Sequence, residues 1–537
     1  MPGWNFADVW EAIATQIPDA QAQVHGDRRV TWSEFDRRAN GVAAALIARG
    51  ATEQDKVAQY LFNGPEYIES MFAAFKAGLV PINTNYRYQD DELVYLWDNA
   101  DAVAVVFHGT FTDTIERIRD RVPRVATWLW VDDGAGLCPE WAAPYEEAAN
   151  GYPERVEGPW DRSGDQLMMT YTGGTTGMPK GVMWRQDGLF RTLVAQMNPL
   201  YRTADADPDL VRSQVTQPGP VGMPACPLMH GTGLYTQLIV LSMGGSSVTL
   251  SSRRLDIEEM FDTIERERVN QIAIVGDAYG KPMLKALDEN PGRWDLASLF
   301  LVASSGVMWS EPVKQGLLKH HPSMILVDAF SSSEAVGMGQ SVSSGTSASE
   351  TATFRLGENT IVITDDGRRV EPGSGEIGRV AVGGFQPIGY YKDPEKTAAT
   401  FIEFEGQRYS CPGDYAMVEA DGSLTLLGRG SVVINTGGEK VFPEEVEEVL
   451  KTYPGVRDAV AVAVPDDKFG EVVAAVVETA PEAGVQAQDL IAHVRGKLAT
   501  YKAPKYVYTI DTIGRAPNGK VDYKRLKAFA ADSLAAG

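Results

Sequence analysis

Residues 167–182 hold the densest group of residue types that could bind an anion. Within residues 172–182, four glycines and three threonines accompany Lys180. Glycine lets the backbone fold around an anion and present its N–H groups, threonine hydroxyls add donors, and lysine adds a full positive charge. The pattern therefore predicts a phosphate-binding loop that follows an apolar strand. The alternative, a flexible surface hairpin, leaves the density of donors unexplained.

Three further patterns resemble known nucleotide or metal sites, but their sequence context argues against such a site. Each Gly-Lys pair is followed by Pro, Leu or Val, and not by the Ser or Thr of the common P-loop; the pairs occupy 280–281, 496–497 and 519–520. Residues 373–378 match Gly-x-Gly-x-x-Gly but lead into a strand, so they predict a turn and not a dinucleotide site. His320 and His321 lack further Cys or His ligands, so we expect solvated histidines.

Composition and charge restrict the class of protein. The chain has 537 residues, of which 44% are hydrophobic and 23% charged, so we expect a globular protein with more than one domain. Its 72 acidic and 49 basic residues give a net charge of −23, which would repel nucleic acid. A polyanion such as ATP or coenzyme A can bind only where local donors reverse the field.

Cysteine content and apolar runs indicate the compartment. Cys138, Cys226 and Cys411 are too few and too widely spaced for a disulfide framework or a metal site, which predicts reduced thiols. The amino terminus lacks the basic and apolar regions of a secretory signal, and no run reaches about 18 apolar residues. We therefore expect a cytoplasmic protein without a transmembrane segment.

The elements that position the loop alternate between helix and strand. Helices are predicted at 32–49, after the capping box that begins at Thr31, and near 65–77. This alternation is typical of an α/β layered fold. The predicted strands lie at 56–61, 102–107, 127–131, 246–250, 271–275, 299–303 and 324–328.

The predicted secondary structure changes towards the carboxyl terminus. Residues 350–428 predict short strands separated by Gly and Pro turns. After Gly430 we predict a small α+β unit, and therefore two domains, 1–430 and 431–537. Its predicted helices lie at 443–452 and 487–499, and its strands at 457–464, 471–478 and 506–510.

Five segments resemble, in order, the signatures of the adenylate-forming superfamily of acyl-CoA synthetases, luciferases and peptide-synthetase adenylation domains. They are Tyr171-Thr-Gly-Gly-Thr-Thr-Gly-Met-Pro-Lys-Gly181, Phe330-Ser-Ser-Ser-Glu334, Tyr409-Ser-Cys-Pro-Gly-Asp414, Gly428-Arg429 with Gly437-Gly-Glu-Lys-Val-Phe-Pro-Glu-Glu445, and Arg515-Ala-Pro-Asn-Gly-Lys-Val521. The resemblance implies a large amino-terminal body of several α/β subdomains and a small mobile carboxyl-terminal lid. It also implies ATP, Mg²⁺ and coenzyme A as cofactors.

Site residues follow from the resemblance, position by position. Phe330 would stack on adenine, Asp414 and Arg429 would hold the ribose, and Glu334 with Thr172 would bind Mg²⁺, which prefers oxygen ligands. Taken alone, Glu334 would be read as a solvated or capping carboxylate. The residues implied to contact ATP or AMP are Thr172, Gly173, Gly174, Thr175, Thr176, Gly177, Lys180, Ser305, Gly306, Ala329, Phe330, Ser331, Ser333, Asp414, Arg429 and Lys520.

Coenzyme A and the mobile lid involve the segment after residue 430. The resemblance implies that Gly437, Gly438 and Glu439 line the pantetheine path and that residues 430–431 form a pivot between two half-reactions. Five positions depart from the family pattern: Ser331, Ser333, Pro412, Ser431 and Asn435. The changes at Ser333 and Pro412 are tolerable, because Ser333 keeps a hydroxyl and Asp414 is still present, whereas the other three leave the pivot and some coenzyme A contacts open.

The acid substrate is indicated by the predicted acyl pocket. Amino-acid adenylation domains carry an Asp where this chain has His230, so an acid without an α-amine is expected. A buried, satisfied histidine is the alternative interpretation of His230, which we also include among the catalytic candidates. The predicted pocket residues are His230, Tyr235, Asp277, Ser304 and Gly306.

The resemblance is greatest to actinobacterial fatty-acid–CoA ligases, in particular to the group that activates steroid side-chain acids. It predicts an AMP-forming acyl-CoA ligase for a hydrophobic acid. Two alternatives stay open: a carrier-protein or peptide-synthetase adenylation enzyme, for which no carrier domain follows in the sequence, and a non-catalytic nucleotide-binding regulator, which would be expected to lack Lys520, Glu334 or Asp414. A homodimer also stays open.

Lys520 is predicted to catalyse the first half-reaction only. A carboxylate and the α-phosphate are both anionic, so a cation that bridges them stabilises the transition state. Lys520→Ala should abolish ATP–pyrophosphate exchange, whereas thioester formation from a preformed acyl-adenylate survives in good part. An exposed lysine without a catalytic role is the alternative, and exchange at the wild-type rate would support it.

Overall fold

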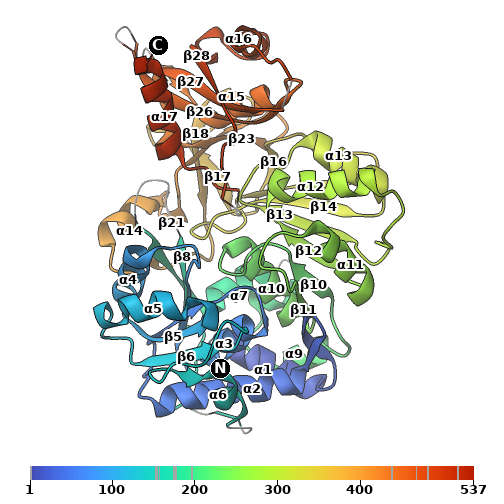
Figure 1. Ribbon diagram of the computed structural model, residues 1–537, viewed down its shortest axis with the longest axis vertical. Coiled ribbons are helices and arrows are strands. Elements are labelled where there is room, and N and C mark those ends of the chain that lie inside the picture. Colours follow the sequence, from blue (N-terminus) through green and yellow to red (C-terminus); the bar gives the residue numbers. More distant parts are fainter. Residues whose placement is uncertain are drawn as a thin grey trace. The chain divides into compact units, whose positions relative to one another are not determined.

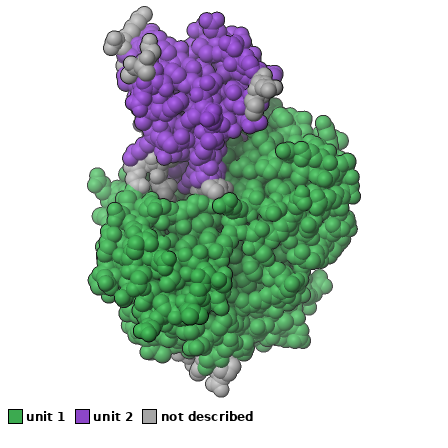
Figure 2. Space-filling view, viewed as in Figure 1, with its two compact units in different colours: residues 1–351, 382–410 green, residues 352–381, 411–537 purple. Residues whose placement is uncertain are grey.

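A computed structural model describes residues 3–151, 155–156, 158–172, 178–194, 197–436, 439–466, 469–480, 483–516 and 519–536. The chain forms two compact units, Met1–Thr351 with Val382–Ser410, and Ala352–Ala381 with Cys411–Gly537 (Figure 2). Large layered sheets with helices make up the first unit, and the second contains the small carboxyl-terminal α+β region, which confirms the predicted fold class. The pivot predicted near residue 430 lies inside the second unit and stays a prediction.

One sheet of the first unit is parallel except at its edges. Its strands stand in the order β2 (Arg28–Thr31), β1 (Gln21–His25), β11 (Ser246–Thr249), β10 (Val221–Pro224), β12 (Gln271–Ile274), β13 (Leu301–Ser305), β14 (Ile325–Phe330) and β15 (Gly339–Ser344). Figure 1 shows α11 (Ile257–Glu267), α12 (Gly276–Glu289) and α13 (Glu311–His320) beside these strands. The apolar faces of these helices share one buried cluster with apolar side chains of the central strands, such as Met223, Ile272, Val302 and Leu326.

The other sheet of the first unit carries the predicted phosphate loop. Its order is β19 (Gly389–Tyr390), β9 (Lys180–Arg185), β8 (Leu167–Thr172), β4 (Val80–Asn83), β3 (Lys56–Tyr60), β5 (Ala102–His108), β6 (Thr127–Val131) and β7 (Ala143–Pro144). A core cluster joins α1 (Phe6–Gln16), α2 (Trp32–Ala48), α3 (Pro65–Lys76) and α10 (Gly231–Ser242).

The remaining elements of the first unit are short. They are α4 (Asp90–Asn99), α5 (Thr112–Ile118), α6 (Tyr145–Asn150), α7 (Gln186–Val194), α8 (Leu200–Thr203), α9 (Pro208–Gln214), α14 (Pro394–Thr400), β20 (Phe401–Phe404), β21 (Gln407–Ser410), η1 (Gly109–Phe111) and η2 (Arg119–Arg121). Among the described residues, no helix is both long and apolar enough to cross a membrane.

The second unit holds two groups of strands. The first comprises β16 (Thr353–Leu356), β17 (Thr360–Ile363), β18 (Ile377–Val382), β22 (Asp414–Val418) and β23 (Ser423–Arg429). The second has the order β25 (Glu439–Val441), β24 (Ile434–Thr436), β27 (Gly470–Thr479) and β26 (Val456–Asp466), with β28 (Tyr506–Ile510) beside β27. Its helices are η3 (Gly430–Val432), α15 (Pro443–Lys451), α16 (Ala487–Arg495), η4 (Thr500–Lys502) and α17 (Tyr523–Ala536).

Local sequence signals account for most predicted elements. The Thr31 hydroxyl accepts a hydrogen bond from the Glu34 N–H at 3.2 Å, which confirms the predicted start of α2. The predicted strands are present, although β13 begins at Leu301 and not at residue 299. A turn closed by the Ser374 N–H and the Glu371 carbonyl, at 3.1 Å, precedes β18, so the segment that begins at Gly373 starts in a turn and leads into a strand, as predicted. Bounds were predicted from the sequence for α2, α3, α15 and α16 only, so α1, α4 to α14 and α17 were not predicted individually.

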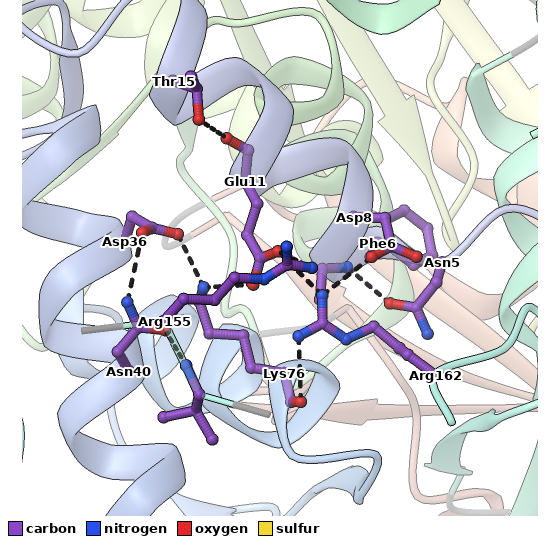
Figure 3. A network of polar contacts seen from close by, with 12 residues as sticks. Asn5, Phe6, Asp8, Glu11, Thr15, Asp36, Asn40, Lys76, Arg155 and Arg162 are labelled. Carbon is purple, nitrogen blue, oxygen red and sulfur yellow. Dashed lines mark hydrogen bonds and ion pairs between the residues drawn. The ribbon is translucent and has the colours of Figure 1, made fainter. Parts of the chain in front are cut away.

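A buried ion network fastens α1, α2 and α3 to one another (Figure 3). The fully buried Lys76 ammonium lies 2.7 Å from both Glu11 Oε1 and Asp36 Oδ1. The other Glu11 oxygen lies 3.0 Å from Arg162 Nη1, which also contacts Asp8 at 2.9 Å. A buried charge is tolerated only when it is paired. These contacts therefore hold the three helices in fixed positions relative to one another.

Glu11 should make the stability of the first unit depend on pH. Burial alone would raise the pKa of Glu11, but Lys76 and Arg162 lower it from 4.5 to about 2. A carboxyl whose pKa is lower in the folded state stabilises fully above its unfolded pKa, and this stabilisation is lost as pH falls through the folded value. We expect the contribution of Glu11 to the free energy of unfolding to shrink by about 2 kcal/mol between pH 7 and pH 3.

Urea midpoints of the wild type and Glu11→Gln measure this contribution. The gap between the two midpoints should be large at pH 7 and clearly smaller at pH 3. Glu140→Gln, at an exposed position, is the control and should match the wild type at both pH values. A gap that stays constant with pH would contradict the assignment to Glu11.

Candidate active site

The base of the predicted phosphate loop is a hairpin held by a buried amide. Strands β8 and β9 pair antiparallel, with Thr172 opposite Lys180. Asn83 accepts a hydrogen bond from the Tyr171 N–H at 2.7 Å and donates to the carbonyls of Tyr171 at 2.9 Å and Met229 at 2.7 Å. Thr172 and Lys180 therefore have fixed positions, whereas the predicted loop residues 173–177 lie outside the described residues.

Lys180 forms an ion pair with a carboxylate that sequence reasoning missed. Its ammonium contacts Asp393 Oδ2, while Asp393 Oδ1 accepts a hydrogen bond from the Lys396 N–H at 2.8 Å at the start of α14. The hydrogen bond from Lys180 is the main reason that the pKa of Asp393 is lowered. The Asp-Pro pair before α14 is a helix-start signal that could have drawn attention to this residue.

The segment after β14 places Glu334 on the other side of the site. Trp184 Nε1 donates to the Ser333 carbonyl at 2.8 Å, and Ser410 Oγ donates to the Glu334 carbonyl at 2.7 Å. The Tyr390 hydroxyl donates to Glu334 Oε1 at 2.9 Å. Backbone and carboxylate of Glu334 are therefore both held, so Glu334 is not the freely solvated carboxylate of the alternative interpretation.

Other predicted nucleotide contacts border the same segment. Phe330 ends β14 and is 8% exposed, and Ala329 precedes it in the strand. The Ser331 hydroxyl accepts a hydrogen bond from the Gly337 N–H at 3.0 Å, which closes the turn that follows Phe330. The adjacent strand β13 ends at Ser305, directly before Gly306. These positions agree with a shared nucleotide site, and their individual roles stay predictions.

The predicted acyl-pocket residues come from three neighbouring segments. His230 is the N-cap residue of α10, and the Tyr235 hydroxyl lies 3.3 Å from Thr170 Oγ1. Burial raises the pKa of Tyr235 to about 12, so the phenol stays neutral and can act as a hydrogen-bond donor. Ser304 Oγ accepts a hydrogen bond from the Gly276 N–H at 2.9 Å, at the start of α12.

Gly306 and Asp277, two further predicted pocket residues, have different surroundings. Gly306 has a φ of +92°, which disfavours other residues, and among the described residues a Cβ there would meet Thr232 Oγ1 alone, at 3.8 Å. Asp277 Oδ1 instead accepts hydrogen bonds from the N–H and hydroxyl of Ser310, at 2.9 and 3.0 Å. The carboxylate of Asp277 therefore has a structural task at the start of α13, and its role in the pocket stays a prediction.

The second unit contains the residues assigned to ribose and to catalysis. Asp414 and Arg429 face each other across β22 and β23, and Arg429 Nε lies 3.2 Å from Asp414 Oδ1. Lys520 is exposed, and its carbonyl accepts a hydrogen bond from the Ala516 N–H at 2.9 Å. Gly437, Gly438 and the side chain of Glu439 lie outside the description of the structure, so the predicted coenzyme A contacts stay predictions.

Mg²⁺ fits the oxygen donors of this site. Glu334 is partly exposed and its carboxylate is held in place, and Thr172 at the end of β8 is also partly exposed. Among the described residues, no group of three or more Asp, Glu, His or Cys could hold a metal by itself. Since Mg²⁺ is commonly held by one or two carboxylates together with phosphates and water, Glu334 and Thr172 are suitable ligands for a nucleotide-bound ion.

Comparisons with known proteins show the family to which the chain belongs. A family model described as AMP-binding enzyme matches residues 10–391, and one described as AMP-binding enzyme C-terminal domain matches residues 445–520. The chain is 41% identical to a 3-oxocholest-4-en-26-oate–CoA ligase of Rhodococcus rhodochrous, over 97% of this chain and 95% of that protein. It is 39% identical to a medium/long-chain-fatty-acid–CoA/3-oxocholest-4-en-26-oate–CoA ligase of Mycobacterium tuberculosis, over 99% and 98% of the two chains.

Solved structures share the fold at low sequence identity. The anthranilate CoA ligase AuaEII in complex with anthranoyl-AMP has a TM-score of 0.83 and 20% identity, with 100% of this chain and 99% of that chain covered. ATP-bound MatB from Rhodopseudomonas palustris has a TM-score of 0.80 and 22% identity, with 99% and 100% covered.

Asp414 should contribute to ATP binding. An ionised acceptor makes hydrogen bonds worth about 1.5–3 kcal/mol, so we expect Asp414→Ala to raise the Kd for ATP about tenfold or more. Asp421→Ala, in the turn of the same hairpin, is the matched control and should leave the Kd unchanged. Equilibrium dialysis measures both; equal Kd values for Asp414→Ala and the wild type would show that Asp414 does not hold the nucleotide.

Proposed function

Because the chain belongs to the family of AMP-binding enzymes, we propose that it is an ATP-dependent ligase that joins a hydrophobic carboxylic acid to coenzyme A and releases AMP. The observation that carries the proposal is that Lys180, at the start of β9, and Glu334, in the segment after β14, are both held by residues 389–393, which pair with the signature hairpin. A fixed cation and a fixed carboxylate linked through one segment suit a metal-bound triphosphate.

The first half-reaction forms an acyl-adenylate. A carboxylate oxygen of the acid attacks the α-phosphorus of ATP, the bond to the β-phosphate oxygen breaks, and pyrophosphate leaves with its electron pair. Residues 172–180 would hold the phosphates, and Lys520 would neutralise the negative charge that develops between the two anions. Mg²⁺, held by Glu334 and Thr172, would supply further positive charge to the phosphate oxygens.

The second half-reaction transfers the acyl group to sulfur. The thiol of coenzyme A attacks the acyl carbon, loses its proton, and AMP leaves with the former carboxylate oxygen. We assign the pantetheine path to residues 437–439 and the pivot that exchanges the two arrangements to residues 430–431. Small residues at the pivot would absorb the change in backbone angles.

A steroid side-chain acid or a medium- to long-chain fatty acid is the proposed substrate. The full-length similarity to ligases named for these acids supports the assignment. So does the start of α10, where His230, Gly231 and Tyr235 offer weakly polar groups in place of a carboxylate that would pair with an amine. The free thiols of Cys138, Cys226 and Cys411 fit the cytoplasm, where ATP and coenzyme A are available.

AMP release should depend on both coenzyme A and a hydrophobic acid. We expect kcat/KM for a steroid side-chain or long-chain acid to exceed that for acetate or an amino acid at least about tenfold, which corresponds to roughly 1.4 kcal/mol of transition-state binding. The assay measures AMP and thioester together, with and without coenzyme A. AMP formation without any thioester would favour a carrier-protein ligase, and no ATP cleavage with any acid would favour a non-catalytic regulator.

A further inference from the structure

Residues 389–393 are fixed to the strand that carries Lys180. Strand β19 pairs antiparallel with β9, with Gly389 opposite Met183 and Tyr390 opposite Val182. The backbone pairing continues on both sides, because the Ile388 N–H donates to the Met183 carbonyl and the Tyr391 N–H to the Gly181 carbonyl, each at 2.8 Å. The segment therefore has a defined register against the phosphate hairpin.

Two successive tyrosines of this segment make similar bonds to different carboxylates. The side chain of Tyr390 is buried against Phe401, with 6.0 Å between the ring centroids, and its hydroxyl donates to Glu334 Oε1 at 2.9 Å. Tyr391 donates to Asp101 Oδ2 at 2.8 Å. Since successive side chains of a strand point to opposite faces, only Tyr390 serves the predicted metal ligand.

Thr397 connects the two ends of the segment. Its hydroxyl accepts a hydrogen bond from the Tyr390 N–H at 2.9 Å and donates to the Asp393 carbonyl at 2.7 Å. Asp393 then uses one carboxylate oxygen to cap α14 and the other to contact Lys180. The side chains that reach Glu334 and Lys180 therefore belong to one hydrogen-bonded turn.

We propose that Tyr390 and Asp393 are positioning residues of the nucleotide site, which set the Glu334 carboxylate and the Lys180 ammonium relative to each other before MgATP binds. The inference rests on the proposed function. Hydrogen bonds to a metal-ligating carboxylate orient it and raise metal affinity. A lysine ammonium has three donors, so Lys180 can keep its bond to Asp393 while it donates to a phosphate. Holding its flexible stem in advance reduces the entropy lost on binding.

Tyr390→Phe tests the link to Glu334. The variant keeps the buried ring and removes only the hydroxyl, so we expect the Mg²⁺ concentration that half-saturates tight ATP binding to rise about tenfold. ATP binding without Mg²⁺ should stay unchanged, because the hydroxyl acts through the metal ligand. Calorimetric titration with ATP at several Mg²⁺ concentrations measures both quantities.

Tyr391→Phe is the matched control, since it removes the same group from the next residue and its bond to Asp101. It should behave as the wild type at every Mg²⁺ concentration. The proposal is wrong if Tyr390→Phe shows no change in Mg²⁺ dependence, or if both variants change it equally. A purely structural role of Tyr390 would weaken ATP binding with and without Mg²⁺ alike.

Asp393→Asn tests the other part of the proposal, the link to Lys180. It also keeps the proposal testable if Tyr390→Phe fails to fold. Asn is as good a helix cap as Asp, so the variant removes the charge and keeps the start of α14. Because the pair is partly exposed, we expect the Kd for ATP to rise only about threefold, in Mg²⁺ as well as without it. An unchanged or lower Kd would overturn this part.

Asp256→Asn, at the N-cap of α11, is the corresponding control and should leave the Kd unchanged. ATP binding by the wild type distinguishes failure of the proposed function from failure of the positioning role. If the wild type binds no ATP under any condition, the proposed function fails. If it binds ATP and neither site variant differs from its control, Tyr390→Phe from Tyr391→Phe and Asp393→Asn from Asp256→Asn, the function stands and the positioning role fails.

Discussion

Two anions must meet in a protein that is itself strongly negative. A carboxylate and a triphosphate repel each other, and a net charge of −23 adds to the cost of bringing either into the site. The reaction is therefore feasible only where positive charge and N–H donors are concentrated and fixed. In the proposed reaction, Lys180, Lys520 and the glycine-rich loop would meet that need, and contacts within the first unit hold Lys180 in place.

The first unit fixes Glu334 and Lys180 through bonds that join its two sheets. Glu334 follows β14 of one sheet, and Lys180 begins β9 of the other. Bonds across the junction run from Trp184 to the Ser333 carbonyl and from Tyr390 to the Glu334 carboxylate. Each sheet is in turn supported by buried helices, and Lys76 ties α1, α2 and α3 into a single charged cluster. Rigidity at the site thus originates in packing well outside it.

Much of this arrangement follows from local sequence. The cap at Thr31, the apolar strands and the turn before β18 depend on neighbouring residues, so residue type and spacing are sufficient to predict them. The density of Gly, Thr and Lys in residues 172–182 likewise predicts a phosphate loop. The resemblance to a known superfamily added the individual roles, which single residue types such as Asp414 or Glu334 do not carry by themselves.

Contacts between distant residues could not be predicted in this way. Tyr390 and Glu334 are 56 positions apart, and Lys180 and Asp393 are 213 apart, so no local period connects them. The contact of Asp277 could not be predicted either: this predicted pocket residue accepts a hydrogen bond from the Ser310 N–H, 33 positions away. Helix α1 was missed although its start carries a local signal, the N-cap residue Asn5, whose side chain accepts a hydrogen bond from the Ala7 N–H. Its contact with Lys76, by contrast, is long-range.

Transfer of oxygen from the acid to AMP is the most direct measurement of the central claim, that the acid is activated as an adenylate. A hydrophobic acid labelled with ¹⁸O in its carboxyl group is incubated with the protein, ATP, Mg²⁺ and coenzyme A, and the products are analysed by mass spectrometry. Attack of the carboxylate on the α-phosphorus predicts one labelled oxygen in each AMP and none in pyrophosphate. Label in inorganic phosphate, or thioester formed with unlabelled AMP, would contradict it.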